Sequence, residues 1–397
     1  MKKVQEYSGG VSLDANVALV KHNAEVGSKL AVEYSQLLKG NTHSQSSPGG
    51  TTKSLHTTPK AGQGKLIAIG AAAVDYQIRP DNELKLYQSC AGTWTSTFGG
   101  VARNIAEVAC RLGVETHLVT AVGGDSVSQS IEEGIGQVGI EGHFIRNPAL
   151  KGATFLEIFD DKNEGVVAIS DMKVNPMLTV DNIHEHFFKG EEQRGPNPKD
   201  IVLIDVNYMG QPGDLLRQLR YFNEKGYFVV MECKASKSLR IFEDNAFEYI
   251  SLLRMNNTEC NIITEELVKK GVKAEDRYRW FADNIGKKCK GDRYTEARAV
   301  ITNGTSNIHI VSPSSVKTIT PVKSDKLVKT TGAGDTLTGA IIALLLRGKQ
   351  IEEAVRWGAV ASKMTVESTS TFSVISDQLN YEQLEKEVSK YRSEQLV

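Results

Sequence analysis

Short apolar runs alternate with longer amphipathic stretches from residue 65 onwards. Residues 66–69, 116–121 and 202–205 have the length and composition of buried strands. Residues 103–112 and 127–138 carry apolar side chains at helical spacing. Strands that alternate with helices predict an α/β domain with a mainly parallel sheet covered on both faces. Further strands are expected at residues 228–231, 250–253 and 299–302.

One pair of apolar segments departs from this alternation. Residues 155–159 and 166–169 flank the polar residues 160–165, which have the composition of a hairpin loop. We therefore expect a small β hairpin in addition to the main sheet.

The first 64 residues follow a different pattern. Residues 11–38 carry apolar side chains at steps of three and four without an interrupting Pro, which predicts one amphipathic helix, although Gly27 weakens it. Residues 40–63 are rich in Ser, Thr, Gly and Pro, which is typical of a disordered linker. The pattern thus divides the chain into a helical segment at 1–39, a linker at 40–64 and a main domain at 65–397.

Composition narrows the function classes. The chain has 397 residues and a net charge of −1, so its overall charge does not favour binding to nucleic acid or to a membrane surface. Its longest glycine-free apolar run, residues 340–346, is too short to span a bilayer, and the N-terminus lacks the apolar core of a signal peptide. The five cysteines are scattered without metal-ligand spacing, so we expect free thiols and a cytoplasmic protein.

The sequence Thr330-Thr331-Gly332-Ala333-Gly334-Asp335 precedes an apolar run at residues 336–346, so its glycines are expected where a loop becomes a helix. A helix start offers free backbone N–H groups and a partial positive charge, which attract anions. A carboxylate beside a bound phosphate is unfavourable because the two negative charges repel each other. Its presence is explained if the carboxylate acts as the base in phosphoryl transfer. The alternative is an ordinary glycine-rich turn followed by an Asp.

Polar residues recur where the predicted strands end. Because ligands of parallel α/β sheets bind at the carboxyl ends of strands, these residues suggest a site, although turns at strand ends also favour Asp and Asn. The residues are Asp75, Asp205, Glu232, Asn256 and Asn303.

Several motifs, in order, resemble those of the ribokinase-like (PfkB) carbohydrate kinases. Residues 99–106 with Leu112-Gly113 resemble the first family signature, and residues 331–335 with Gly339 resemble the second. Asn256-Asn257-Thr258-Glu259 resembles the Asn-x-x-Glu motif between them, and residues 122–125 match another recurrent stretch. The resemblance covers residues 65–397. It implies a ribokinase-like three-layer α/β sandwich, with a mainly parallel central sheet and a small β lid.

The resemblance also implies a catalytic apparatus. Asp335 would take the proton from the attacking hydroxyl. The backbone N–H groups of Gly332, Ala333 and Gly334 would hold the charge that develops on the transferred phosphate. The hydroxyls of a ribose-like substrate would be bound by Asp75, Gly99, Gly100 and Asn104. Taken singly, Asn104 is also consistent with a helix cap and Asp75 with a turn.

Two ligands follow from the same resemblance, ATP as co-substrate and Mg²⁺. Asn256 and Glu259 would arrange Mg²⁺ through its waters, although Asn256 also fits an ordinary strand-end turn. The hairpin at 160–165, with residues 76–98, would form the lid that excludes water, and a homodimer through the lid is left open. The ATP pocket would be lined by Asn303, Gly304, Thr331 and Ala361.

Finer features resemble pseudouridine kinases more than sugar or adenosine kinases. These features are the sequences of residues 103–106, 167–172 and 205–207. Because of this resemblance, Asp171 and Asn207 are also expected to bind the substrate. The expected reaction is ATP-dependent phosphorylation of the 5′-hydroxyl of pseudouridine. The alternatives are another sugar or nucleoside kinase of the family and a non-catalytic nucleotide-binding protein.

Residues 9–24 resemble the C-terminal end of a pseudouridine-5′-phosphate glycosidase. Residues 1–39 would then be the helical remnant of a glycosidase domain. Because the catalytic body of that enzyme is missing, glycosidase activity is not expected.

The sequence departs from the family six positions before Asp335. Many members carry an Asp there that helps to bind a monovalent cation, whereas this chain has Lys329. A lysine ammonium would repel such a cation and could supply a similar charge itself. The hypothesis is that the enzyme works without added K⁺; the alternative is a solvent-facing Lys329 at a site that has been lost.

Overall fold

The computed structural model describes most of the chain from residue 64 onwards. The chain divides into two compact units, Met1–Ser54 and Leu55–Val397, and all labelled strands and helices belong to the second. The described residues are 64–85, 87–162, 165–191, 197–206, 213–234, 237–243, 246–289, 294–324, 326–370 and 372–391, with Lys21 and Lys29. The helix predicted at 11–38, the linker at 40–63 and Asn207 lie outside them, so the predicted domain boundaries stay predictions.

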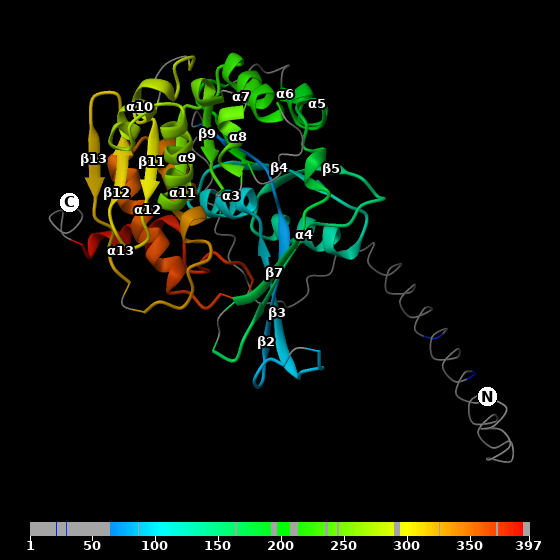
Figure 1. Ribbon diagram of the computed structural model, residues 1–397. Helices are drawn as coiled ribbons and strands as arrows, with labels where there is room; N and C mark the ends of the chain where they lie inside the picture. Colours follow the sequence, from blue (N-terminus) through cyan, green and yellow to red (C-terminus); the bar gives the residue numbers. More distant parts are fainter. Residues whose placement is uncertain are drawn as a thin grey trace, which may run out of the picture. The chain divides into compact units, whose positions relative to one another are not determined.

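A nine-stranded sheet forms the centre of the second unit (Figure 1). Its order is β13-β12-β11-β10-β9-β8-β1-β4-β5, parallel from β5 to β11 and antiparallel at β12 and β13. The mainly parallel sheet predicted from the sequence is therefore confirmed. The strands are β1 (Leu66–Ile69), β4 (Thr116–Val122), β5 (Glu141–Arg146), β8 (Ile201–Asp205), β9 (Phe228–Glu232), β10 (Leu252–Asn256), β11 (Ala299–Thr302), β12 (Ile308–Val311) and β13 (Val316–Ile319).

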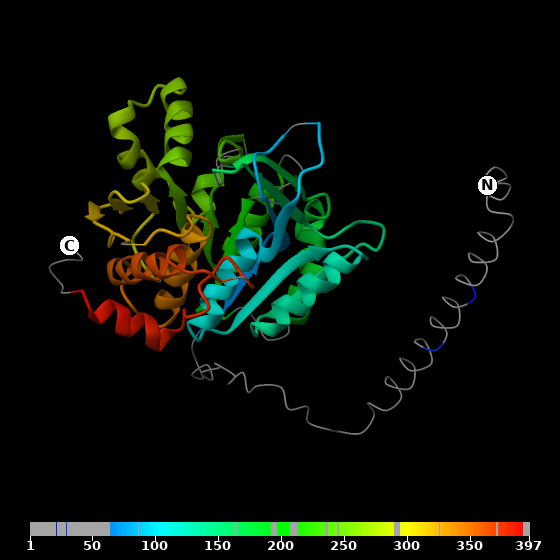
Figure 2. The same cartoon turned by 90° about the horizontal axis from the view of Figure 1, so that it is seen from below.

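Helices cover both faces of this sheet, which confirms the predicted three layers. Along β1, Leu66 and Ala68 pack into one apolar core and Ile67 and Ile69 into the other, because successive side chains of a strand point to opposite faces. The first core contains α3 (Val101–Arg111), α4 (Ser126–Gln137), α11 (Ala333–Leu346), α12 (Ile351–Val366) and α13 (Tyr381–Ser389). The second contains α5 (Val180–Ile183), the π-helical turn η2 (His184–Phe188), α7 (Asp214–Glu224), α8 (Arg240–Glu243), α9 (Asn257–Lys269) and α10 (Arg277–Asn284). In Figure 2 the orange and red C-terminal helices lie side by side, in agreement with the contacts of α12 with α11 and α13.

A second, four-stranded sheet extends away from this sandwich (Figure 1). It consists of β2 (Ala73–Pro80), β3 (Gly92–Gly99), β6 (Thr154–Phe159) and β7 (Gly165–Asp171) in the order β3-β2-β6-β7. The predicted hairpin is its β6–β7 pair, which is antiparallel, as is β2–β3; β2 and β6 pair in parallel. The small sheet expected beside the main one is therefore present.

Strand β5 has no counterpart among the predicted strands. Its sequence, Glu-Gly-His-Phe-Ile-Arg, offers few apolar positions because it lies at the edge of the sheet. Among the described residues, no helix combines the length and the apolar character that crossing a bilayer would require.

Candidate functional site

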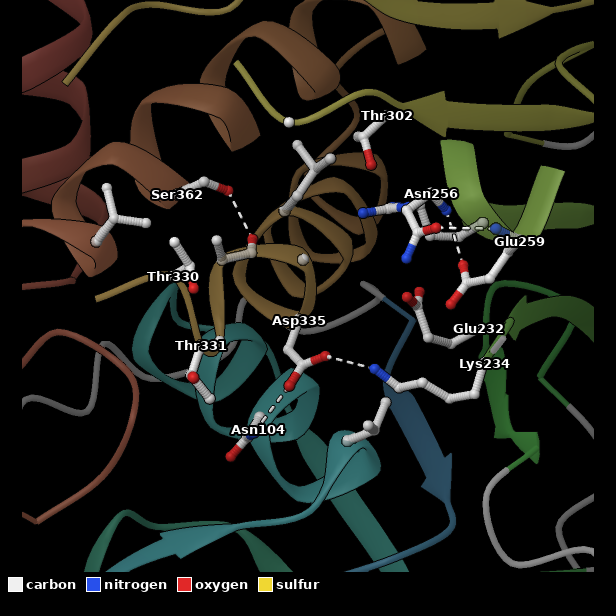
Figure 3. Close-up of a pocket in the computed structure, with 18 of the residues that line it drawn as sticks. Asn104, Glu232, Lys234, Asn256, Glu259, Thr302, Thr330, Thr331, Asp335 and Ser362 are labelled. Atoms are coloured by element: carbon white, nitrogen blue, oxygen red, sulfur yellow. Dashed lines mark hydrogen bonds and ion pairs between the residues drawn. The ribbon is translucent and has the colours of Figure 1, made fainter. Parts of the chain in front are cut away.

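A pocket of about 920 Å³ opens at the carboxyl ends of the central strands (Figure 3). Its walls come from the ends of β9 and β10, the start of α3, the glycine-rich loop and the first turn of α11. Most of the residues predicted for the site line it. They are Asp75, Gly100, Asn104, Asn256, Glu259, Gly304, Thr331, Gly332, Ala333, Gly334 and Asp335.

The glycine-rich loop enters α11 through Gly332, which has a left-handed φ of 82°. A Cβ at this position would lie 3.1 Å from Val374, so both the backbone and the space favour glycine. The Ser362 hydroxyl, on α12, donates a hydrogen bond of 2.8 Å to the Ala333 carbonyl. The helix start is thereby held in place, with the backbone N–H groups of its first turn at the pocket.

Asp335 lies in this first turn and is 8% exposed. Its Oδ2 accepts a hydrogen bond of 2.8 Å from Asn104 Nδ2, and its Oδ1 is 4.0 Å from the Lys234 ammonium (Figure 3). The fold thus joins three segments that are far apart in the sequence. Such contacts orient the carboxylate toward the pocket, as a proton acceptor for a bound hydroxyl requires.

A second carboxylate, Asp75, lines the same pocket at the root of the small sheet. Burial raises its pKa to about 7, although the Arg103 guanidinium pulls it down. Gly99 makes room for this side chain, because a Cβ there would lie 2.0 Å from Asp75 Oδ2. Gly100 begins α3 with a φ of 94°, and its missing Cβ lets the backbone at Ala71 approach closely.

Asn256 and Glu259 form a capping box at the start of α9. The Glu259 N–H donates to Asn256 Oδ1 at 3.0 Å, and the Asn256 N–H donates to Glu259 Oε2 at 2.8 Å. Asn256, for which the sequence also allowed a strand-end turn, is thus the N-cap of α9, and both residues line the pocket. The capping box places two oxygen-bearing side chains at the pocket in a fixed orientation.

Glu232, at the end of β9, adds a second acidic group to this wall, beside Glu259. It is buried, burial raises its pKa to about 8, and the Thr338 hydroxyl donates a hydrogen bond of 2.8 Å to its Oε2. Carboxylate and amide oxygens are the ligands that Mg²⁺ prefers, and Mg²⁺ keeps several of its waters. A buried carboxylate whose pKa is raised gains from a nearby cation, so Glu232, Asn256 and Glu259 are suitable for such an ion.

Two cationic residues of the pocket, Lys234 and Arg254, were not predicted from the sequence. Burial lowers the pKa of Lys234, but the Asp335 and Glu232 carboxylates outweigh this and raise it above the usual value. Arg254 is 3% exposed, and its Nε and Nη1 atoms have no hydrogen-bond partner among the described residues. A charged residue within the apolar strand Leu-Leu-Arg-Met-Asn was the signal that could have identified Arg254.

Four predicted residues do not line the pocket. Gly99 acts through the space it leaves for Asp75, and Asn303 lies between the lining residues Thr302 and Gly304. Ala361 is fully buried in α12. Asp171, between the lining residues Ser170 and Met172, lies 3.5 Å from the Lys173 ammonium through its Oδ2.

Lys329 is half-buried rather than directed freely into solvent. Burial lowers its pKa, and the Asp377 and Glu107 carboxylates oppose that shift. The Lys329 N–H donates to the Val366 carbonyl at 3.1 Å, which anchors the segment before the glycine-rich loop to α12.

Known proteins resemble this chain in sequence and in fold. The model of the pfkB family carbohydrate kinases matches residues 63–378. The chain is 24% identical to ribokinase of Haemophilus influenzae, over 76% of this chain and 92% of that protein. It is 30% identical to pseudouridine kinase of Escherichia coli, over 30% of this chain and 39% of that protein. The structure of Arabidopsis thaliana ribokinase complexed with ribose and ATP has a similar fold, with a TM-score of 0.61 at 17% identity over 83% of this chain and all of that one.

Proposed function

This chain belongs to the pfkB family of carbohydrate kinases, and within that family we propose that it transfers the γ-phosphoryl group of ATP to the 5′-hydroxyl of pseudouridine. The relatives are phosphotransferases that act on an alcohol group. The observation that carries the proposal is Asp335, a carboxylate held by Asn104 at the start of α11 in a pocket that Asp75 also lines.

Asp335 is the proton acceptor of the proposed reaction. As the acceptor oxygen bonds to the γ-phosphorus and the bond to the β-phosphate oxygen breaks, the hydroxyl proton passes to an Asp335 carboxylate oxygen. The Asn104 amide keeps the other oxygen occupied and fixes the carboxylate plane. The products are a 5′-phosphate and ADP.

The negative charge that develops on the transferred phosphoryl group would be stabilised by the start of α11 and by two cationic side chains. The first turn of α11 lines the pocket, and Lys234 and Arg254 line the same cavity. Arg254 lines this cavity, and a guanidinium matches the geometry of phosphate oxygens, so it can donate to the transferred group. Preorganised donors of this kind stabilise a transition state most effectively.

Mg²⁺ fits the acidic wall of the pocket, where it would neutralise phosphate charge. Glu232 and Glu259 would hold it, directly or through water, together with the Asn256 side chain. Since the raised pKa of Glu232 comes from its burial, an adjacent cation would favour its ionised form.

The acceptor end of the pocket supports a nucleoside with ribose hydroxyls. Asp75 can accept hydrogen bonds from two neighbouring hydroxyls, and Phe155, Ser170 and Met172 of the small sheet and its flank border the same space. The choice of pseudouridine rests on the similarity to the E. coli pseudouridine kinase and on the motifs at residues 167–172.

The test is a panel of acceptors with purified protein, MgATP and a coupled assay for ADP. Pseudouridine should give a kcat/KM at least about tenfold above those of uridine, ribose and adenosine, the discrimination expected from about one lost contact of 1–2 kcal/mol. Faster turnover of ribose or adenosine would favour the other sugar and nucleoside kinases of the family. No transfer to any alcohol would contradict the kinase assignment.

A further inference from the structure

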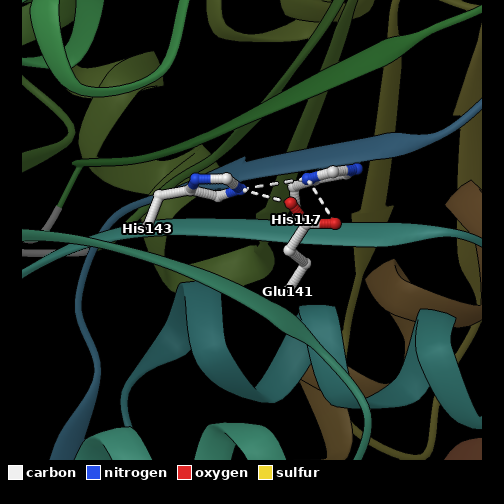
Figure 4. A group of neighbouring side chains, drawn as sticks. All are labelled: His117, Glu141 and His143. Carbon is white, nitrogen blue, oxygen red and sulfur yellow. Dashed lines mark hydrogen bonds and ion pairs between the residues drawn. The ribbon is translucent and has the colours of Figure 1, made fainter.

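A second group of polar side chains lies at the opposite end of the strands from the pocket (Figure 4). His117 is on β4, and Glu141 and His143 are on the edge strand β5. In the parallel register of these strands, His117 pairs with Glu141 and Val119 with His143. All three side chains therefore lie on the face where Val119 and Ile145 join the apolar core.

Placing the His117 imidazole at this buried position costs free energy. His117 is 5% exposed, and Phe187 of the π-helical turn η2 packs edge-on against both rings, with centroid distances of 5.5 Å to His117 and 4.5 Å to His143. Burying a polar group costs free energy unless a partner compensates. A valine would continue the apolar row of β4 at no such cost, so the imidazole needs a reason.

The atoms of the group converge on one point. His117 Nδ1 is 3.0 Å from His143 Nε2. Glu141 Oε2 is 3.6 Å from the first of these nitrogens, and Glu141 Oε1 is 3.5 Å from the second. A tetrahedral zinc ion with bonds of about 2.0–2.1 Å needs ligand atoms about 3.4 Å apart. The two nitrogens would separate by roughly 0.4 Å on that geometry, and the Glu141 side chain would turn to bring one oxygen to the ion.

A further carboxylate orients the buried ring. His117 Nε2 is 3.1 Å from Glu115 Oε1, a contact in which the ring nitrogen donates. The proton is then on Nε2, and the lone pair of Nδ1 points at His143 and Glu141. In metal sites, the ring nitrogen of a histidine that does not bind the metal commonly donates a hydrogen bond to a carboxylate, which fixes the orientation of the ring.

We propose that His117 Nδ1, His143 Nε2 and the Glu141 carboxylate bind a transition-metal ion such as Zn²⁺, with water as the fourth ligand. The ion would fasten the edge strand β5 to β4. Two imidazoles favour Zn²⁺ over Mg²⁺, which selects oxygen ligands, so this site is chemically distinct from the acidic wall of the pocket. Without the ion, His143 Nε2–H would donate to His117 Nδ1 across the same 3.0 Å.

The experiment measures Zn²⁺ binding to the full-length, tag-free chain after removal of metal by a chelator, by competition with a chromophoric zinc indicator. We expect one ion per chain and a thermal unfolding midpoint that rises with Zn²⁺, because a ligand that binds the folded state stabilises it. Millimolar Mg²⁺ should displace none of it. Neither readout depends on phosphoryl transfer, so the result is independent of the proposed kinase activity.

Four variants locate the ion. Glu141→Gln and His143→Gln change ligands that are at least partly exposed, so both should fold, and each should weaken Zn²⁺ binding by at least about tenfold. Glu115→Gln should weaken it by about 10- to 100-fold through the orientation of His117. His186→Gln, an exposed histidine outside the group, is the matched control and should change nothing. Absence of Zn²⁺ binding, or binding that is undiminished in both His143→Gln and Glu141→Gln, would overturn the proposal.

Discussion

The two sides of the pocket are built in different ways. On the transfer side, formed by residues 330–335, α11, Lys234 and Arg254, backbone and charged groups are fixed against the core, and α11 is buried from Asp335 to Leu346. The acceptor side consists of Asp75, Gly99 and the small sheet, where large apolar side chains such as Trp94 and Ile169 are 63% and 61% exposed. In the proposed reaction the transfer chemistry would therefore rest on the buried side, and the choice of acceptor on the more exposed side.

Replacing the base of the transfer side should have the largest effect. Asp335→Asn keeps the size of the side chain and one acceptor oxygen but removes its basicity. We expect kcat to fall by about 10²–10⁴-fold while ATP binding, measured by calorimetry, is retained. Asp283→Asn, on the exposed face of α10, is the matched control. A variant with half the parental rate would show that Asp335 is not the base.

Removing a buried cation on the same side should cost somewhat less. Arg254→Met should lower kcat by roughly 10²-fold, the low end of what one preorganised donor contributes, while the KM for the acceptor stays near the parental value. Arg254→Lys retains the charge and should recover part of the rate. If both variants kept the parental kcat, Arg254 would serve only the fold.

On the acceptor side the effect should be on KM. In Gly99→Ala the new methyl group would lie 2.0 Å from Asp75 Oδ2 and must displace that carboxylate. We expect the KM for the acceptor to rise about tenfold, as for the loss of roughly 1.4 kcal/mol of binding, and the KM for ATP to stay unchanged. Equal changes in both constants would mean that the two sides are not separable.

The pKa of Asp75 gives the acceptor side a pH dependence of its own. Because that pKa is raised to about 7, the carboxyl group is protonated below this pH and ionised above it. Only the ionised form accepts hydrogen bonds through both oxygens, so the KM for the acceptor should fall severalfold as the pH rises through about 7. Asp75→Asn should have a higher KM without this dependence, and a parallel pH profile in the variant would assign the titration to another group.

The smallest effect concerns Lys329. If its ammonium replaces a monovalent cation beside the glycine-rich loop, replacing Na⁺ by K⁺ at constant ionic strength should change kcat by less than about twofold. A severalfold, K⁺-specific activation would show that other groups form a cation site.

The transfer side was largely predictable because its residues are consecutive. The turn of Gly332, the helix start and Asp335 follow from one hexapeptide and the apolar run behind it. For Arg254 the sequence offered only a charged residue within an apolar strand. That Arg254 and Lys234 reach the pocket follows from the pairing of β9 with β10, which the sequence does not show. Strand β5 was not predicted for a related reason. Glu141 and His143 break its apolar pattern, and only the pairing of β5 with β4 brings them next to His117.

The product of a single reaction tests the central claim most directly. Pseudouridine, MgATP and the enzyme would be incubated, and the product would be examined by phosphorus and proton NMR. The account predicts one phosphomonoester whose phosphorus couples to the C5′ protons, formed in amounts equal to the ADP released, and none with Asp335→Asn. Phosphate on another hydroxyl, or ADP formed with free phosphate alone, would contradict it.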